Sequence, residues 1–136
     1  MEELYLQQNQ IKEIKNLDKN LKLETLDLAM NKITKFEALD ELPELRELWM
    51  NWNMLEDSEH NKDFLKKLKL KTVYLADNPL SNVDNYETLL TTSMPTLKQI
   101  DGNVLRPGGK FYHQRTPGIH SVIKKEMNPE AKKILE

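Results

Sequence analysis

The sequence predicts an α/β fold made of repeats: a right-handed solenoid with a short parallel sheet on its concave face and a helical cap at its C-terminal end. Two observations predict it. One apolar pattern recurs four times in the first 81 residues, and a helical pattern followed by a strand pattern ends the series at residue 101. The whole length of 136 residues fits one domain.

The repeated pattern is L-x-x-L-x-L-x-x-N-x-L, in which Met, Val or Ile replaces some of the leucines. It occupies residues 1–11, 23–33, 45–55 and 70–80, with steps of 22, 22 and 25 residues. This is the pattern and the spacing of a leucine-rich repeat. We therefore expect residues 1–81 to form four strand units.

Apolar residues alternate within each unit as they do in a half-buried strand, so we expect them to face the core. They are Leu4, Leu6, Leu26, Leu28, Leu48, Met50, Val73 and Leu75. Each unit also carries an asparagine where the chain must turn. We expect these side chains to bond backbone groups of that turn and of the next repeat. They are Asn9, Asn31, Asn53 and Asn78.

The longer third step contains an insertion at 57–67, in which Asn61 is suited to cap a short helix over 63–68. The C-terminal cap is expected at 82–101, where Tyr86, Leu89, Leu90 and Met94 have helical spacing. We interpret residues 102–136 as an extended, mildly basic tail with a short helix at 129–135. Its role as a second contact arm is an alternative.

No cap precedes the first repeat, because Met1 already occupies an apolar repeat position. This predicts a longer solenoid, an incomplete gene model, or an edge that is hidden in an oligomer, such as a homodimer through the N-terminal strand.

Outward positions of the strands define a candidate binding face. The central column holds Tyr5, Asp27, Trp49 and Tyr74, so three exposed aromatic side chains stand beside a carboxylate. Tyr and Trp are common anchors of interfaces, and the acidic neighbours predict a partner that is basic at its edge. These neighbours and one further aromatic complete the candidate face: Glu3, Glu47, Trp52 and Asp77. The alternative is that the rings only pack against each other across strands.

Segments 47–51, 70–80 and 95–101 resemble the C-terminal repeats and cap of the leucine-rich-repeat regulatory subunit of protein phosphatase type 1. The resemblance implies a protein without activity of its own that holds the phosphatase catalytic subunit on its concave face. It also implies which residues make contact: Asp27, Glu47, Trp49 and Tyr74, with Glu3 and Tyr5 less directly matched. Trp52 and the tail depart from the family pattern.

Composition argues against other functions. Cysteine is absent, and the three histidines are scattered, so we expect no catalytic site, metal or cofactor. The net charge of −2 and the acidic face argue against direct binding of nucleic acid, and no apolar run could span a membrane. We expect the nucleus and cytoplasm as location. Scaffolds of the splicing particle and light chains of axonemal motors, which carry similar caps, are the alternatives.

Overall fold

A computed structural model describes residues 2–106 and 110–112, and it contains one sheet of seven strands that follow one another in chain order. The first five strands pair in parallel, and the last two continue the sheet as an antiparallel hairpin. The strands are β1 (Glu2–Tyr5), β2 (Leu23–Asp27), β3 (Glu47–Trp49), β4 (Thr72–Tyr74), β5 (Gln99–Ile100), β6 (Asn103–Arg106) and β7 (Lys110–Tyr112). β6 and β7 were not predicted. The expected helix at 129–135 lies outside the described residues.

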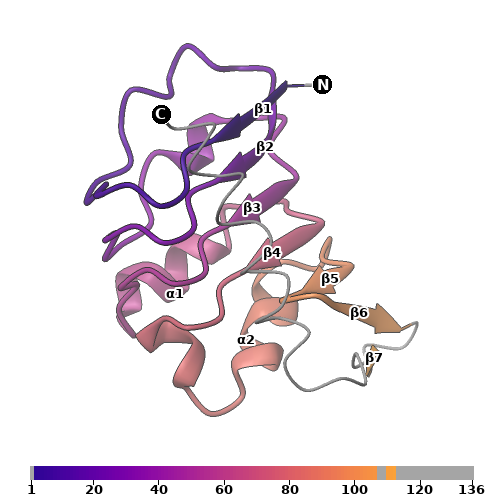
Figure 1. The fold of residues 1–136 in the computed structure, drawn as a ribbon. Coiled ribbons are helices and arrows are strands. Elements are labelled where there is room, and N and C mark those ends of the chain that lie inside the picture. The colour runs from indigo at the N-terminus through magenta and orange to yellow at the C-terminus, as the bar shows by residue number, and fades with distance from the viewer. Residues whose placement is uncertain (1, 107–109, 113–136) are drawn as a thin grey trace.

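Return segments and short helices lie on the opposite side of the parallel strands, as Figure 1 shows for β1 to β4. The two α-helices are α1 (Glu59–Leu65) and α2 (Tyr86–Ser93), and two 3-10 helices cover Leu39–Glu41 and Pro79–Asn82. Strands on one side and helices on the other curve the stack, which makes the outer face of the sheet concave.

Alternating leucines of the strands form the core. Leu26, Leu48 and Val73 are completely buried, as the alternation predicted. Leu4 and Leu6 of the first repeat are only half-buried, because β1 pairs with β2 on one side and with no other described strand. The first repeat therefore contributes less buried apolar surface than the others, and its burial stabilises the fold less.

Asn31, Asn53 and Asn78 are buried and bond the preceding repeat instead of the next one, whereas Asn9 is exposed and its side chain donates only to the carbonyl of Leu6 in its own turn. The Nδ2 atom of Asn53 donates to the carbonyl oxygens of Met50 in its own turn and Leu28 in the preceding repeat, at 3.0 and 2.9 Å. Its Oδ1 accepts from the backbone N–H of Ile33 at 3.1 Å, also in the preceding repeat. Asn31 and Asn78 follow the same scheme. The amides reach back because only the preceding repeat presents unpaired backbone groups there.

Helix α1 begins earlier than the sequence suggested, and Asn61 is not its cap. Ser58 is the N-cap, and its Oγ accepts from the backbone N–H of Asn61 at 3.2 Å. The Asn61 side chain is completely buried instead, and it bonds the backbone of Phe36, Thr34 and Glu56. Asn61 was a plausible cap by residue type, but the backbone groups of the neighbouring repeat compete for its amide.

The cap ends the parallel sheet through one carboxylate. Asp101 Oδ1 accepts from the backbone N–H groups of Leu75 and Ala76 at 2.7 and 3.0 Å, and Asp101 Oδ2 accepts from the Tyr86 hydroxyl at 2.8 Å. In earlier repeats the equivalent N–H groups donate to the next strand; for example, Met50 donates to the carbonyl of Tyr74 at 2.8 Å. The Asp101 side chain thus replaces a carbonyl of a further repeat.

Candidate protein-binding face

The pairing register of strands β1 to β4 places the predicted central column of side chains in one row across the sheet. Tyr5 pairs with Asp27, Asp27 with Trp49, and Trp49 with Tyr74. Glu3 and Glu47 flank this row on either side of Thr25 in the same register. The parallel strands thus place aromatic and acidic side chains, which are far apart in the chain, about 5 Å from strand to strand on one face.

Trp49 and Tyr74 form the aromatic centre of the face. Their rings stack with centroids 4.1 Å apart and an interplanar angle of 19°. The indole Nε1 of Trp49 donates to Oε1 of Glu47 at 2.7 Å, which fixes the rotamer of the ring. The two rings are half-buried, where the sequence analysis expected them to be exposed, because each covers one face of the other. An anchor that is held in place in this way loses little entropy when a partner binds.

Tyr5 extends the row on β1. Its hydroxyl donates to Oε2 of Glu3, and this hydrogen bond, with further contributions from burial and neighbouring carboxylates, raises the Tyr5 pKa to about 12. Burial also raises the pKa of the Tyr74 hydroxyl. The Tyr5 proton is thus held in the hydrogen bond to Glu3.

Asp27 lies between the Tyr5 and Trp49 positions and is buried, with 1% of its surface exposed. Its burial was not predicted from the outward column in which the sequence places it. Its Oδ1 accepts from the backbone N–H of Ala29 at 3.0 Å. Burial raises the Asp27 pKa to about 6; the Glu47 carboxylate adds to this effect, and the Ala29 hydrogen bond opposes it. At neutral pH the row therefore holds a buried negative charge with no cation beside it among the described residues.

A second row lies immediately beyond the first. Backbone hydrogen bonds from Gln8 to Ala29 and from Met30 to Asn51, at 2.8 and 2.9 Å, continue the same register past the strand ends. Gln7, Ala29 and Asn51 are all buried, yet Gln7 Oε1 and Asn51 Oδ1 accept no hydrogen bond. The sequence assigns these residues no role, because burial of an outward amide leaves no trace in the repeat pattern.

Two predicted site residues lie apart from these rows. Trp52 and Asp77 occupy the turn, where the backbone takes a left-handed conformation with φ of 58° and 63°. Gln8 and Met30 take the same conformation at the equivalent positions, so it belongs to the repeat. Trp52 is 49% exposed, which is high for a tryptophan. It extends the edge of the face.

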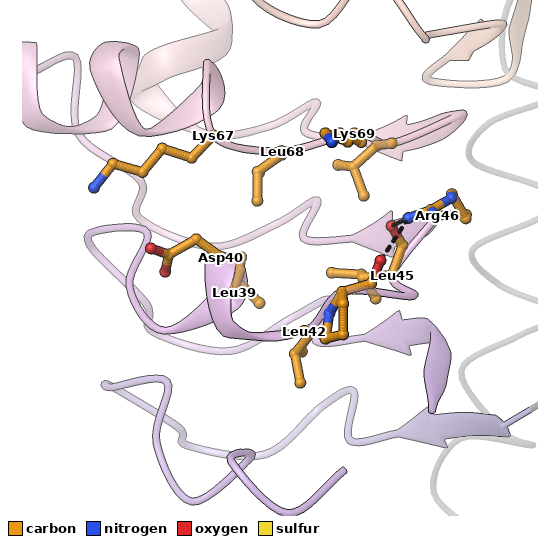
Figure 2. A pocket seen from close by; sticks show the side chains of 10 residues that line it. Leu39, Asp40, Leu42, Leu45, Arg46, Lys67, Leu68 and Lys69 are labelled. Carbon is orange, nitrogen blue, oxygen red and sulfur yellow. Dashed lines mark hydrogen bonds between the residues drawn. The ribbon is translucent and has the colours of Figure 1, made fainter. Parts of the chain in front are cut away.

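A groove outside the concave face lies between the segments that precede β3 and β4, with a volume of about 290 Å³. Figure 2 shows its leucine lining, with Arg46, Lys67, Lys69 and Asp40 around it. The leucines belong to the buried core, and the Arg46 guanidinium donates to the carbonyl oxygens of Pro43 and Leu45 at 3.1 and 2.9 Å. The groove is thus a junction between repeats, and the Arg46 guanidinium at its edge already bonds carbonyl groups of its own turn.

Neither a metal site nor a membrane helix is found in the described part of the chain. No three His, Asp or Glu side chains among residues 2–106 and 110–112 gather in a way that could hold a metal ion. No described helix has the length and apolar character needed to cross a membrane.

The family described as Leucine Rich repeats (2 copies) matches residues 1–41. A chain of the SNF/U2A′ complex of Drosophila melanogaster superposes over 98% of this chain and 86% of its own length, with a TM-score of 0.59 and 22% identity. This chain has a leucine-rich-repeat fold. The Chaetomium Mex67:Mtr2 structure matches 68% of this leucine-rich-repeat chain and 63% of its own, with a TM-score of 0.57 and 25% identity.

The resemblance to a phosphatase regulator is confirmed by a relative. Protein phosphatase 1 regulatory subunit pprA of Dictyostelium discoideum is 34% identical over 75 residues, which is 55% of this chain and 22% of that protein. Dynein axonemal assembly factor 11 is also similar. The Mus musculus protein is 34% identical over 99 residues, and the Homo sapiens protein is 33% identical over 129 residues. These matches cover 73% and 95% of this chain, and 21% and 27% of those proteins. The chain thus spans about a quarter of the relatives' length.

Proposed function

We propose that this chain is a non-catalytic protein-binding module that holds the catalytic subunit of protein phosphatase type 1 on its concave face. The observation that carries the proposal is the stacked Trp49–Tyr74 pair beside Glu47 and Asp27. Rings held by hydrogen bonds and stacking are typical anchors, and the carboxylates suit a basic edge on the partner. The similarity to the phosphatase regulatory subunit supports this choice of partner.

We expect the face to supply recognition and no chemistry. Glu3 and Glu47 line a shallow surface pocket together with Arg46 and Lys71, and no three His, Asp or Glu side chains of the described residues gather as a metal site would require. The sequence has no cysteine, which is compatible with the reducing nucleus and cytoplasm, where we propose that the protein acts.

Titration of the chain with purified phosphatase catalytic subunit tests the proposal. We expect Trp49→Ala to weaken binding by about 2 kcal/mol or more, which is at least about 30-fold, because the variant removes an anchor. Leu21→Ala is the matched control: Leu21 is a large side chain, 55% exposed, outside the row. Binding that is unaffected by Trp49→Ala would contradict the proposal, and so would an absence of binding to a folded chain.

One observation favours a second function. The similarity to the human dynein axonemal assembly factor extends over 129 residues and therefore beyond the cap at 101. An assembly factor for axonemal motors would also use the concave face to hold a protein. Copurification with a dynein heavy chain, without the phosphatase, would favour this alternative.

A further inference from the structure

The groove between the segments that precede β3 and β4 carries the opposite charge from the concave face. Its volume is about 290 Å³, and the charged groups of its lining are three cations and one carboxylate. They are Arg46, Lys67, Lys69 and Asp40. The row on the concave face and its flanks hold the carboxylates of Glu3, Asp27 and Glu47. The groove therefore attracts a different kind of partner from the one that suits the concave face.

The two lysines of the groove are available to a ligand. Lys67 and Lys69 are exposed, and no described carboxylate lies within ion-pair distance of either ammonium group. The Lys67 ammonium lies 5.1 Å from the centre of the Phe64 ring, a contact that orders the side chain and leaves its charge in place. In Figure 2 both lysines belong to one wall of the groove, and Asp40 and Arg46 belong to the other.

Arg46 is already ordered beside the groove. Its Nη1 donates to the carbonyl oxygens of Pro43 and Leu45 at 3.1 and 2.9 Å, and no described residue accepts from its Nε or Nη2. It also borders the pocket that Glu3 and Glu47 line, but neither carboxylate lies within ion-pair distance of it. A guanidinium held in this way loses little entropy on binding, and its remaining N–H groups can bind a carboxylate.

Between the cations the groove offers a small apolar surface. Core leucines reach its walls with small exposed fractions, 4% for Leu42 and 6% for Leu68, and Pro43 beside them is exposed. The stems of Lys67 and Lys69 add CH₂ groups to this surface. A volume of about 290 Å³ is close to the lower limit of ligand pockets, about 300 Å³, so the groove suits one or two side chains and is too small for a helix.

We propose that this groove binds an extended acidic segment of a partner protein, with one aliphatic side chain between its walls and flanking carboxylates on Arg46 and Lys69. The aliphatic side chain suits the leucine and proline surface, and the carboxylates suit the cations. A nucleic acid would leave the apolar surface unused, and Asp40 would repel its phosphates. The inference does not depend on the partner proposed for the concave face, and it adds a second contact surface of opposite charge.

Fluorescence anisotropy of the full chain with a labelled peptide tests the inference. The probe peptide has one leucine with two glutamates on either side. One control peptide replaces the leucine by glycine, and the other replaces the glutamates by glutamine. We expect the probe to bind at least about fivefold more tightly than either control, and more weakly as the salt concentration rises.

Three variants at exposed positions locate the binding site. Lys69→Glu reverses one charge of the groove and should weaken binding of the probe about fivefold. Asp40→Asn removes the one carboxylate of the lining and should strengthen binding about twofold. Lys32→Glu is the matched control, because it makes the same charge reversal in an exposed turn outside the groove and should leave binding unchanged. Proton–nitrogen correlation spectra will show that each variant is folded.

The same spectra also show where the probe binds. We expect the probe to shift the backbone amides of Leu42, Leu68 and Lys69 and to leave the Trp49 indole unchanged. Shifts at Trp49 in place of the groove, equal effects of Lys69→Glu and Lys32→Glu, or equal binding of the glutamine peptide would overturn the inference. So would an absence of binding, or a short RNA that competes with the probe and binds as tightly.

Discussion

Two aspartates on the same sheet have opposite surroundings. Asp101 in the cap accepts hydrogen bonds from the backbone N–H groups of Leu75 and Ala76 and from the Tyr86 hydroxyl. Asp27 on the concave face accepts one, from Ala29, although it is more deeply buried. Asp101 stabilises the end of the sheet. The Asp27 carboxylate instead costs stability in the free chain, which is typical of a group whose partner belongs to another molecule.

Loss of the Asp101 carboxylate should have the largest effect on the free energy of unfolding. We expect Asp101→Ala to lower the free energy of unfolding by about 4 kcal/mol, because two backbone N–H groups and the Tyr86 hydroxyl lose their acceptor. Urea unfolding measures this. Asp84→Ala, which removes an exposed carboxylate near the same cap, should stay within about 0.5 kcal/mol of the parent. Equal effects of Asp101→Ala and Asp84→Ala would show that the hydrogen bonds of Asp101 do not stabilise the end of the sheet.

The Asp27 carboxylate, which accepts one hydrogen bond, should make the free energy of unfolding fall as pH rises. The folded-state pKa of Asp27, about 6, lies above the ordinary value of 3.8, so between these values the folded chain binds more protons than the unfolded chain. The contribution of Asp27 is therefore most favourable below about pH 4 and is lost as pH rises through about 6. The free energy of unfolding of the parent chain should therefore fall by about 3 kcal/mol across this range relative to that of the Asp27→Asn variant.

Urea unfolding of both chains from pH 4 to 7.5 checks this prediction. The difference between them isolates Asp27 from the other carboxylates, whose protonation changes the stability of both chains alike. A difference that does not vary with pH would show that Asp27 is as well solvated in the folded chain as in the unfolded one.

The aromatic pair should affect folding least. Trp49→Ala removes the stack on Tyr74 and the hydrogen bond to Glu47, and we expect it to lower the unfolding free energy by about 1 kcal/mol. This cost is smaller than the expected loss of partner binding, because the ring lies outside the core. Thermal unfolding followed by circular dichroism measures it. Complete unfolding of the variant would mean that the ring belongs to the core.

The sequence was sufficient to predict the repeats, the buried leucines, and a helix followed by a strand after the fourth repeat. Periodic apolar residues decide which side of a strand faces the core, and Leu26, Leu48 and Val73 are buried for that reason. The hairpin of β6 and β7 was missed because Asn103–Arg106 shows no alternation from which a strand could be read. The true cap of α1, Ser58, was missed because Asn61 is an equally good capping residue by type.

Less of the candidate site could be predicted. The row of Tyr5, Asp27, Trp49 and Tyr74 follows from the repeat register alone. Burial of Asp27, and the unbonded oxygens of Gln7 and Asn51, depend on contacts between segments that are 22 or more residues apart. A pattern that tells outward from inward cannot tell a buried outward group from a solvated one.

The affinity of Asp27→Asn for the phosphatase catalytic subunit tests the central claim most directly, measured by calorimetric titration at pH 7.5 beside the parent chain. If the carboxylate is kept for a basic partner at the expense of stability, the variant should be more stable than the parent and bind at least about tenfold more weakly. A variant that binds as tightly as the parent, or that is less stable, would contradict the claim that this face is built for a partner's positive charge.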